Sequence, residues 1–185
     1  MGIRLSDARY EEIKRIVVDM FVEHGISCVP ISAFEIAYKM GITVIPYSAF
    51  PPNKRLLLLK KSMDGFSVEL VTGEWRIYYN DGIENYGRVN NTIMHEIGHI
   101  VLDHSEESEL AEAEVRFFAK YALVPPPLVR KLGISNYVQI MAAFDVSFEA
   151  AKNALNYYNK WMAYGGEHYS DYEVALLNQF DSVSA

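Results

Sequence analysis

Cysteine is nearly absent from the sequence: Cys28 is the only one among 185 residues. A single cysteine cannot form a disulfide within the chain, so we expect a reducing, cytoplasmic compartment. Long hydrophobic runs are absent as well. The four leucines at Leu56–Leu59 have the length of a strand, whereas a transmembrane helix needs about 20 apolar residues. We therefore expect a protein that does not cross a membrane.

Basic residues are also few: 17 lysines and arginines stand against 24 aspartates and glutamates, which gives a formal net charge of −7. Proteins that bind nucleic acid usually carry a basic face, so this balance argues against DNA or RNA as the main partner. Half of the residues are hydrophobic, and a chain of this length can bury a core within one domain. We expect a single globular domain.

The first half of the sequence alternates between helical and strand-like patterns. Apolar residues spaced three and four apart predict a helix that ends near Gly25. A capping box, Ser32-Ala-Phe-Glu35, opens a second helix that Gly41 closes. A short strand is expected at residues 42–46. Tight turns at Asp64-Gly65 and Thr72-Gly73 then separate three further expected strands: residues 55–61, 65–71 and 75–80.

The second half of the sequence reads as helices: 86–103, 108–123, 128–132, 136–144 and 148–163. Together with the strands they predict an α+β protein, in which a small, mostly antiparallel sheet is packed with helices and the C-terminal part is helical. We divide this single structural domain into a core (1–127), a helical extension packed on the core (128–164) and a C-terminal tail (165–185).

Three of the five histidines lie in one stretch, VNNTIMHEIGHIVLDH at residues 89–104. Positions four apart on a helix lie about 40° apart around the axis and about 6 Å along it, so His95 and His99 point the same way. Two such imidazoles suit one tetrahedral zinc ion, and Glu96 beside them suits a general base. The alternative is a core helix whose histidines make ordinary hydrogen bonds. A third ligand is needed to decide between a metal site and a core helix.

His104 does not supply this ligand in the known HExxHxxGxxH register. It lies nine residues after His95 instead of ten, and Leu102 replaces the glycine that the register requires. We therefore leave His104 outside the expected set of ligands.

Glu114 is the better candidate, because its neighbours one turn away on both sides of the next helix are apolar. An unpaired carboxylate in such a stripe costs several kcal/mol, and a metal ion would remove this cost. Glu112 has Arg116 four residues ahead, so we expect a solvated ion pair there. His95, His99 and Glu114 then form a metal site with an open fourth position. The alternative for Glu114 is a carboxylate that is hydrogen-bonded at the edge of the core.

HEIGHIVLDH, followed by EVRFFAKYALVP, resembles the ImmA/IrrE metallopeptidases, which carry HExxH and then a helix of the form E-A-N-x-F-A-x-x-L-L-x-P. The likeness extends from the first helix to DVSFEAA at residues 145–151. It implies a zincin-like minimal fold and a zinc-dependent endopeptidase. It also implies that Zn²⁺ is bound by His95, His99 and Glu114, and that Glu96 is the catalytic base.

The resemblance further implies a partner: a helix-turn-helix repressor or an antitoxin that the peptidase cleaves. Val115 and Arg116 depart from the usual Ala and Asn, which weakens any role for an asparagine there. The residues around the expected site are acidic. This could favour a basic, DNA-binding substrate, but a solvated helix face with acids at the helix N-terminus is the first explanation. These acids are Asp103, Glu106, Glu107, Glu109, Glu112 and Glu114.

Two other functions stay open. Residues 136–155 read as helix, turn and helix, so the protein could be a transcription regulator, but only Lys152 and Lys160 lie on the second helix. A non-catalytic interaction module with a structural metal is the other alternative, and an intact Glu96 argues against it.

Several supporting roles have more than one candidate. Tyr79, His104 and Tyr121 could each stabilise an oxyanion. Asp103 could accept a hydrogen bond from a ligand imidazole. The aromatic residues of the C-terminal part could pack on the body or form a partner surface, and an autoinhibitory tail is a further alternative.

Overall fold

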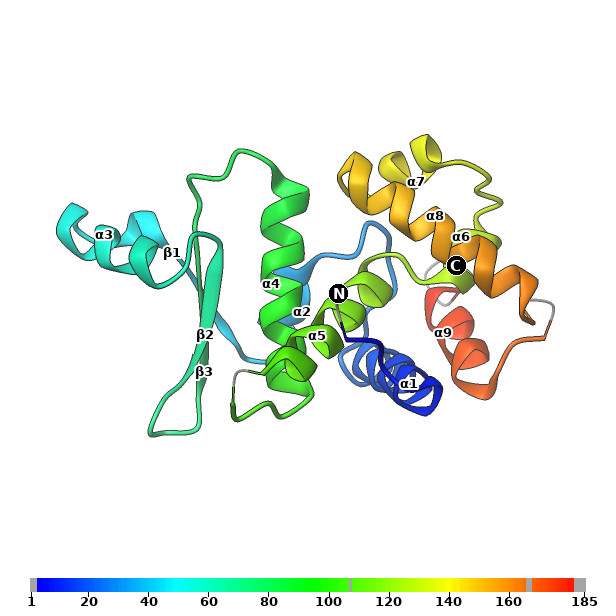
Figure 1. The fold of residues 1–185 in the computed structure, drawn as a ribbon, viewed down its shortest axis with the longest axis horizontal. Helices are drawn as coiled ribbons and strands as arrows, with labels where there is room; N and C mark the ends of the chain where they lie inside the picture. Colours follow the sequence, from blue (N-terminus) through cyan, green and yellow to red (C-terminus); the bar gives the residue numbers. More distant parts are fainter. Residues whose placement is uncertain (1–2, 107, 166–167, 182–185) are drawn as a thin grey trace.

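The computed structural model describes residues 3–106, 108–165 and 168–181. In Figure 1 a small sheet occupies one end of the molecule, a group of C-terminal helices occupies the other, and long helices lie between them. Glu107 and part of the expected tail lie outside the described residues. Among the described helices, none combines the length and hydropathy that a membrane crossing requires.

The first two helices begin where local capping predicts. α1 (Asp7–Glu23) starts after Ser6, whose side chain accepts a hydrogen bond from the backbone N–H of Arg9. α2 (Ala33–Lys39) starts after Ser32, which accepts from the N–H of Glu35 in the same way. The strand β1 (Thr43–Pro46) follows α2. These three elements confirm the expectations for the N-terminal part of the chain.

The strand expected at residues 55–61 is wrong, because this segment forms the helix α3 (Pro52–Lys61) after a short 3₁₀ turn, η1 (Tyr47–Ala49). Leucine, lysine and arginine are all good helix formers, and Pro52 suits the first turn, where its missing N–H is not needed. None of the residues in α3 is buried. The run of leucines therefore builds an exposed helix, which lies on the side of the strands away from the long central helix in Figure 1.

The sheet contains β1, β2 (Gly65–Glu69) and β3 (Trp75–Tyr79) in the order β1-β3-β2. β1 pairs with β3 in parallel, and β2 pairs with β3 antiparallel, so the sheet is mixed. β2 is an edge strand in this described sheet. The α+β class is confirmed, with helices α2 and α4 in contact with the strands.

The rest of the chain is helical, as expected. α4 (Tyr86–Val101) and α5 (Glu109–Leu123) pack against each other, and α1 lies along α5. The C-terminal part adds α6 (Pro126–Lys131), α7 (Tyr137–Phe144) and α8 (Phe148–Ala163). A last helix, α9 (Asp171–Asp181), lies where we expected only a tail, and it packs on α1 and α6. The division at residues 127 and 164 stays a prediction.

One apolar core joins these helices. Its best-buried large side chains include Phe21 of α1, Ile93 and Met94 of α4, Phe118 of α5 and Phe144 of α7. Asn90 of α4 is a buried polar residue, and its side chain is hydrogen-bonded: it accepts from the N–H of Ala33 and donates to the carbonyl of Ile31. Asn90 thereby fixes α4 against the start of α2.

Candidate metal centre

Three side chains from α4 and α5 bring their ligand atoms together. The Nε2 atoms of His95 and His99 lie 3.3 Å apart. One carboxylate oxygen of Glu112 lies 3.3 Å from the Nε2 of His99, and the other lies 3.6 Å from the Nε2 of His95. The ligand atoms of this group all lie within 4.8 Å of one another.

These separations fit a metal ion of the zinc type. In tetrahedral zinc sites the metal–ligand distances are about 2.0–2.1 Å, which places two ligand atoms about 3.4 Å apart. The separation of 3.3 Å between the two Nε2 atoms agrees with this value. Two neutral imidazoles and one carboxylate are also a known donor set for catalytic zinc, with a fourth position left for water or substrate.

The acid beside the histidines is Glu112, and the expectation of Glu114 is corrected here. Residues 112 and 114 lie about 200° apart around a helix axis, so one of them faces α4 when the other faces away from it. The carboxylate of Glu112 turns to His95 and His99 instead of forming the solvated pair we expected with Arg116. The carboxylate of Glu114 is buried and paired with Arg9.

A glycine in α4 allows the close approach that brings Glu112 to the histidines. A Cβ atom built on Gly98 would lie 3.0 Å from a ring carbon of Phe118 and 3.3 Å from a methyl carbon of Val115, both in α5. These distances leave no room for a larger side chain without a shift of the helices. Gly98 therefore sets the spacing between α4 and α5 at the position next to His99.

Glu96 is buried at the same end of α4 and receives a hydrogen bond from the sheet. The hydroxyl of Ser67 in β2 donates to its Oε2 over 2.8 Å. Nothing in the sequence marked Ser67, because the contact depends on how β2 packs against α4.

Burial lowers the pKa of His95 below its ordinary value, although the nearby carboxylates of Glu96 and Glu112 oppose this effect. The ring is therefore neutral at pH 7 and keeps a nitrogen lone pair. A neutral imidazole is the form that binds a metal ion.

The C-terminal turn of α4 places His104 against His99. The backbone N–H of His104 donates to the carbonyl of His99, and the N–H of Asp103 donates to the carbonyl of Ile100. Asp103 has a positive φ of 53°. This is the Schellman arrangement, which returns the chain over the last turn of the helix. As a result, the Nδ1 atoms of His104 and His99 lie 3.2 Å apart.

Behind His104 lies an ion pair between distant helices. The Nε2 of His104 lies 2.9 Å from Oε2 of Glu114. Arg9 of α1 donates to both carboxylate oxygens of Glu114, over 2.8 Å from its Nε and 2.6 Å from its Nη2. The hydrogen bonds from Arg9 hold the pKa of Glu114 below its ordinary value, with a smaller contribution from His104.

The other expected roles have different outcomes. Tyr121 is fully buried, and its hydroxyl has no hydrogen-bond partner within the part of the chain that the structure describes. It therefore belongs to the core and cannot reach an oxyanion. Asp103 is exposed and forms the left-handed residue of the turn, while His104 takes the place beside the imidazole that we expected for Asp103. Tyr79 packs edge-on against Phe34.

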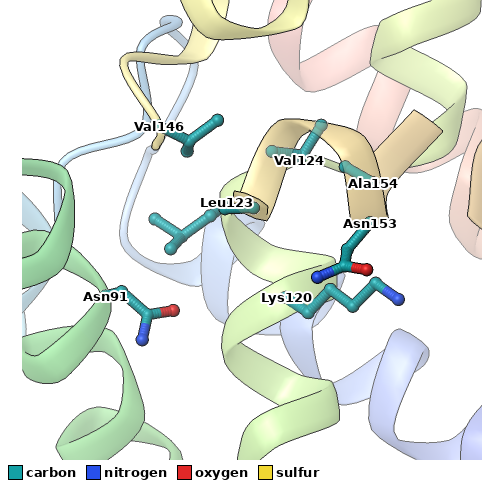
Figure 2. Close-up of a pocket in the computed structure, with 8 residues that line it drawn as sticks. Asn91, Lys120, Leu123, Val124, Val146, Asn153 and Ala154 are labelled. Carbon is teal, nitrogen blue, oxygen red and sulfur yellow. The ribbon is translucent and has the colours of Figure 1, made fainter. Parts of the chain in front are cut away.

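A pocket of about 170 Å³ lies further along the same helices (Figure 2). Asn91 of α4, Lys120 of α5 and Asn153 of α8 supply polar groups to it, and Leu123, Val124 and Val146 supply apolar ones. Asn91 is one turn before His95, and Lys120 is two turns after Glu112. The pocket is therefore about 6–12 Å from the metal ligands along the two helices.

The part of the chain that holds this centre matches a known protein family. The model of a peptidase family, M78, which is described as the IrrE N-terminal-like domain, matches residues 38–156. This range covers the sheet, α4 and α5, with every residue of the cluster formed by His95, His99 and Glu112. None of the curated proteins compared with the chain is similar enough to count as a match.

Proposed function

Because the chain belongs to the M78 peptidase family, whose model covers most of it, we propose that it is a zinc-dependent endopeptidase. The observation that carries this proposal is the convergence of His95, His99 and Glu112 beside the buried carboxylate of Glu96. A purely structural zinc site is usually closed by four protein ligands, and this cluster supplies three.

In this proposal the two imidazoles and the Glu112 carboxylate hold Zn²⁺. A bound zinc ion supplies Lewis acidity, which lowers the pKa of a water molecule and polarises a peptide carbonyl. Burial lowers the pKa of His95, and the neutral ring that results is the form that binds a metal ion. Manganese or iron could use the same ligands.

We assign the general base to Glu96. Ser67 donates to Oε2 of this carboxylate, so Oε1 is the atom we assign to the proton of the attacking water. The same carboxylate then delivers the proton to the leaving nitrogen. Ser67 fixes the orientation of the carboxylate while the proton moves.

The substrate chain has two places to bind near this centre. β2 is an edge strand, and an extended peptide can pair with the free edge of a sheet. Ser67 of β2 contacts Glu96, so a peptide on this edge would run beside the base. The pocket lined by Asn91 and Lys120 would then receive a substrate side chain on the other side of the metal ligands.

For the partner we propose a basic protein of the helix-turn-helix repressor or antitoxin type. Exposed or half-buried acids follow one another from the end of α4 to the first turn of α5, among them Asp103, Glu106, Glu109 and Glu112. A field of this sign attracts a DNA-binding protein, whose surface is basic.

To test this proposal, the zinc-loaded protein is incubated with a repressor or antitoxin encoded by a neighbouring gene. Fluorescein-labelled casein serves as a second substrate. We expect discrete cleavage that a chelator abolishes. Glu96→Gln should abolish it while zinc stays bound. Glu23→Gln, which changes an exposed glutamate at the end of α1, should serve as a control with full activity. Cleavage of casein alone would reject the proposed partner. Cleavage that survives Glu96→Gln would reject the proposed base.

A further inference from the structure

His99 uses both of its ring nitrogens. Its Nε2 faces His95 and Glu112, and its Nδ1 faces the Nδ1 of His104 on the opposite side of the ring. A neutral imidazole has one N–H and one lone pair. If Nε2 gives its lone pair to a metal, Nδ1 carries the hydrogen and donates to the Nδ1 of His104.

This assignment determines the remaining hydrogen bonds. Because the Nδ1 of His104 accepts, its Nε2 carries the hydrogen. That N–H donates to Oε2 of Glu114, 2.9 Å away. The carboxylate also accepts two hydrogen bonds from the guanidinium of Arg9. In this row of hydrogen bonds from Arg9 to His99, each ring N–H meets an acceptor, with no conflict between tautomers.

The side chains in this row of hydrogen bonds are largely shielded from water. The side chains of His104 and Glu114 are 11% and 9% exposed, and that of His99 is 17% exposed. Hydrogen bonds to an ionised carboxylate are stronger than neutral ones, and low exposure strengthens them further. The orientation of His104 is therefore well determined from both sides: by Glu114 at Nε2 and by the backbone turn through Asp103.

We propose that His104, anchored by Glu114 and Arg9, is a positioning residue that holds the ring of His99 with its Nε2 directed at the metal. This inference rests on the proposed metal site and adds residues outside its set of ligands. His104 does not itself bind the metal, because its ring meets His99 on the side away from His95 and Glu112. A partner of this kind fixes the tautomer and orientation of a ligand histidine.

The test is zinc affinity, measured by competition with a chromophoric chelator, and it needs no substrate. We expect His104→Leu to weaken zinc binding by about 10–100-fold, the usual effect of losing such a partner. His168→Leu changes an exposed histidine in the loop before α9 and should leave the affinity unchanged. Thermal unfolding of the metal-free proteins reports whether each variant folds.

Two conservative variants distinguish a positioning role of His104 from a merely structural one. They also test the inference if His104→Leu does not fold. Asparagine carries an acceptor oxygen where His104 has Nδ1, so His104→Asn keeps the bond to His99. Glutamine carries a donor nitrogen where His104 has Nε2, so His104→Gln keeps the bond to Glu114. We expect His104→Asn to bind zinc more tightly than His104→Gln. The reverse order, or unchanged affinity in His104→Leu, would overturn the inference.

A double variant tests the anchor. Glu114→Gln should weaken zinc binding less than His104→Leu, and it should add no further loss when the two changes are combined, because Glu114 acts on the site through His104. Fully additive losses of zinc affinity would contradict the inference that Glu114 acts on the site through His104. Glu112→Gln tests the metal site separately: unchanged zinc binding in that variant would reject the ligand set, whatever His104 does.

Discussion

At the scale of single residues, two glutamates of α5 lie one residue apart and have different partners. Glu112 meets two imidazoles, and Glu114 meets a guanidinium and a third imidazole. Removing one partner of a buried ion pair leaves a charge without compensation, at a cost of about 3–5 kcal/mol. The ion pair with Arg9 therefore offsets the free-energy cost of burying the Glu114 carboxylate, as a metal ion could also have done.

The ion pair with Arg9 predicts a pH dependence of stability. The hydrogen bonds from Arg9 lower the pKa of Glu114 in the folded protein below its ordinary value of 4.5. Its contribution to the unfolding free energy is therefore complete above about pH 4.5 and is lost as the pH falls through the lower, folded value. Glu114→Gln lacks this contribution.

Urea unfolding of the metal-free proteins between pH 6 and 3 measures the effect. The stability difference between wild type and Glu114→Gln should be largest at pH 6 and should shrink on acidification. A constant difference over this range would contradict the assigned pair.

The sequence alone brings His95, Glu96 and His99 to one region, because all three lie close together on one helix, α4. It could not choose between Glu112 and Glu114. The apolar neighbours of Glu114 correctly indicated a buried carboxylate that needs a cation. The cation, however, is Arg9, which lies 105 residues away along the chain. A contact of this length depends on how α1 packs on α5, and no local pattern records it.

At the scale of elements, helix starts were predictable because capping is a local interaction. Ser6, Ser32 and Ser108 each accept a hydrogen bond from the backbone N–H three residues ahead. The identity of α3 was not predictable from hydrophobicity, because a run of leucines suits both a buried strand and a helix. The structure resolves this ambiguity with an exposed helix.

The exposure of α3 predicts tolerance to substitution. The side chains of Leu56 and Leu57 are about 60% exposed. Leu56→Gln and Leu57→Gln should each change the unfolding free energy by no more than about 0.5 kcal/mol. Leu176→Ala, at a fully buried position of α9, should cost about 2–5 kcal/mol. A loss of that size at Leu56 would instead indicate a buried strand.

The packing of α4 on α5 predicts an effect of Gly98→Ala on the metal site. The added methyl group meets Phe118 and Val115, and overpacking costs about 1–3 kcal/mol, which a gain of up to about 1 kcal/mol in helix propensity only partly offsets. We expect weaker zinc binding, because the helices that carry His99 and Glu112 move apart. Asn91→Ala, at an exposed position of α4, is the matched control. Equal zinc affinity in both variants would exclude this role of Gly98.

At the scale of the whole molecule, the centre lies where α4 and α5 meet, and α1 supports it from outside. α9 also packs on α1, where the hydroxyl of Tyr172 donates to Glu11, two residues after Arg9, over 2.6 Å. This helix was expected only as a tail, because its apolar residues are buried only through the contacts of α9 with α1 and α6. The last helix thus stabilises the element that holds Arg9.

Removal of α9 should lower the stability of the protein without weakening metal binding. A chain that ends at Tyr164 loses the buried Tyr172 and Leu176 and uncovers apolar surface of α1, so we expect a clear drop in Tm. Zinc affinity at 25 °C should stay within about threefold of wild type, because none of the three ligands lies in or next to α9. An unchanged Tm would contradict the packing of α9, and a large loss of zinc affinity in the folded protein would contradict its distance from the site.

The most direct measurement is anomalous diffraction at the zinc edge from crystals of the zinc-loaded protein. We predict one strong peak about 2.0–2.2 Å from three atoms: the Nε2 of His95, the Nε2 of His99 and a carboxylate oxygen of Glu112. A peak bound by Glu114 or His104, or no peak at these histidines, would contradict the account.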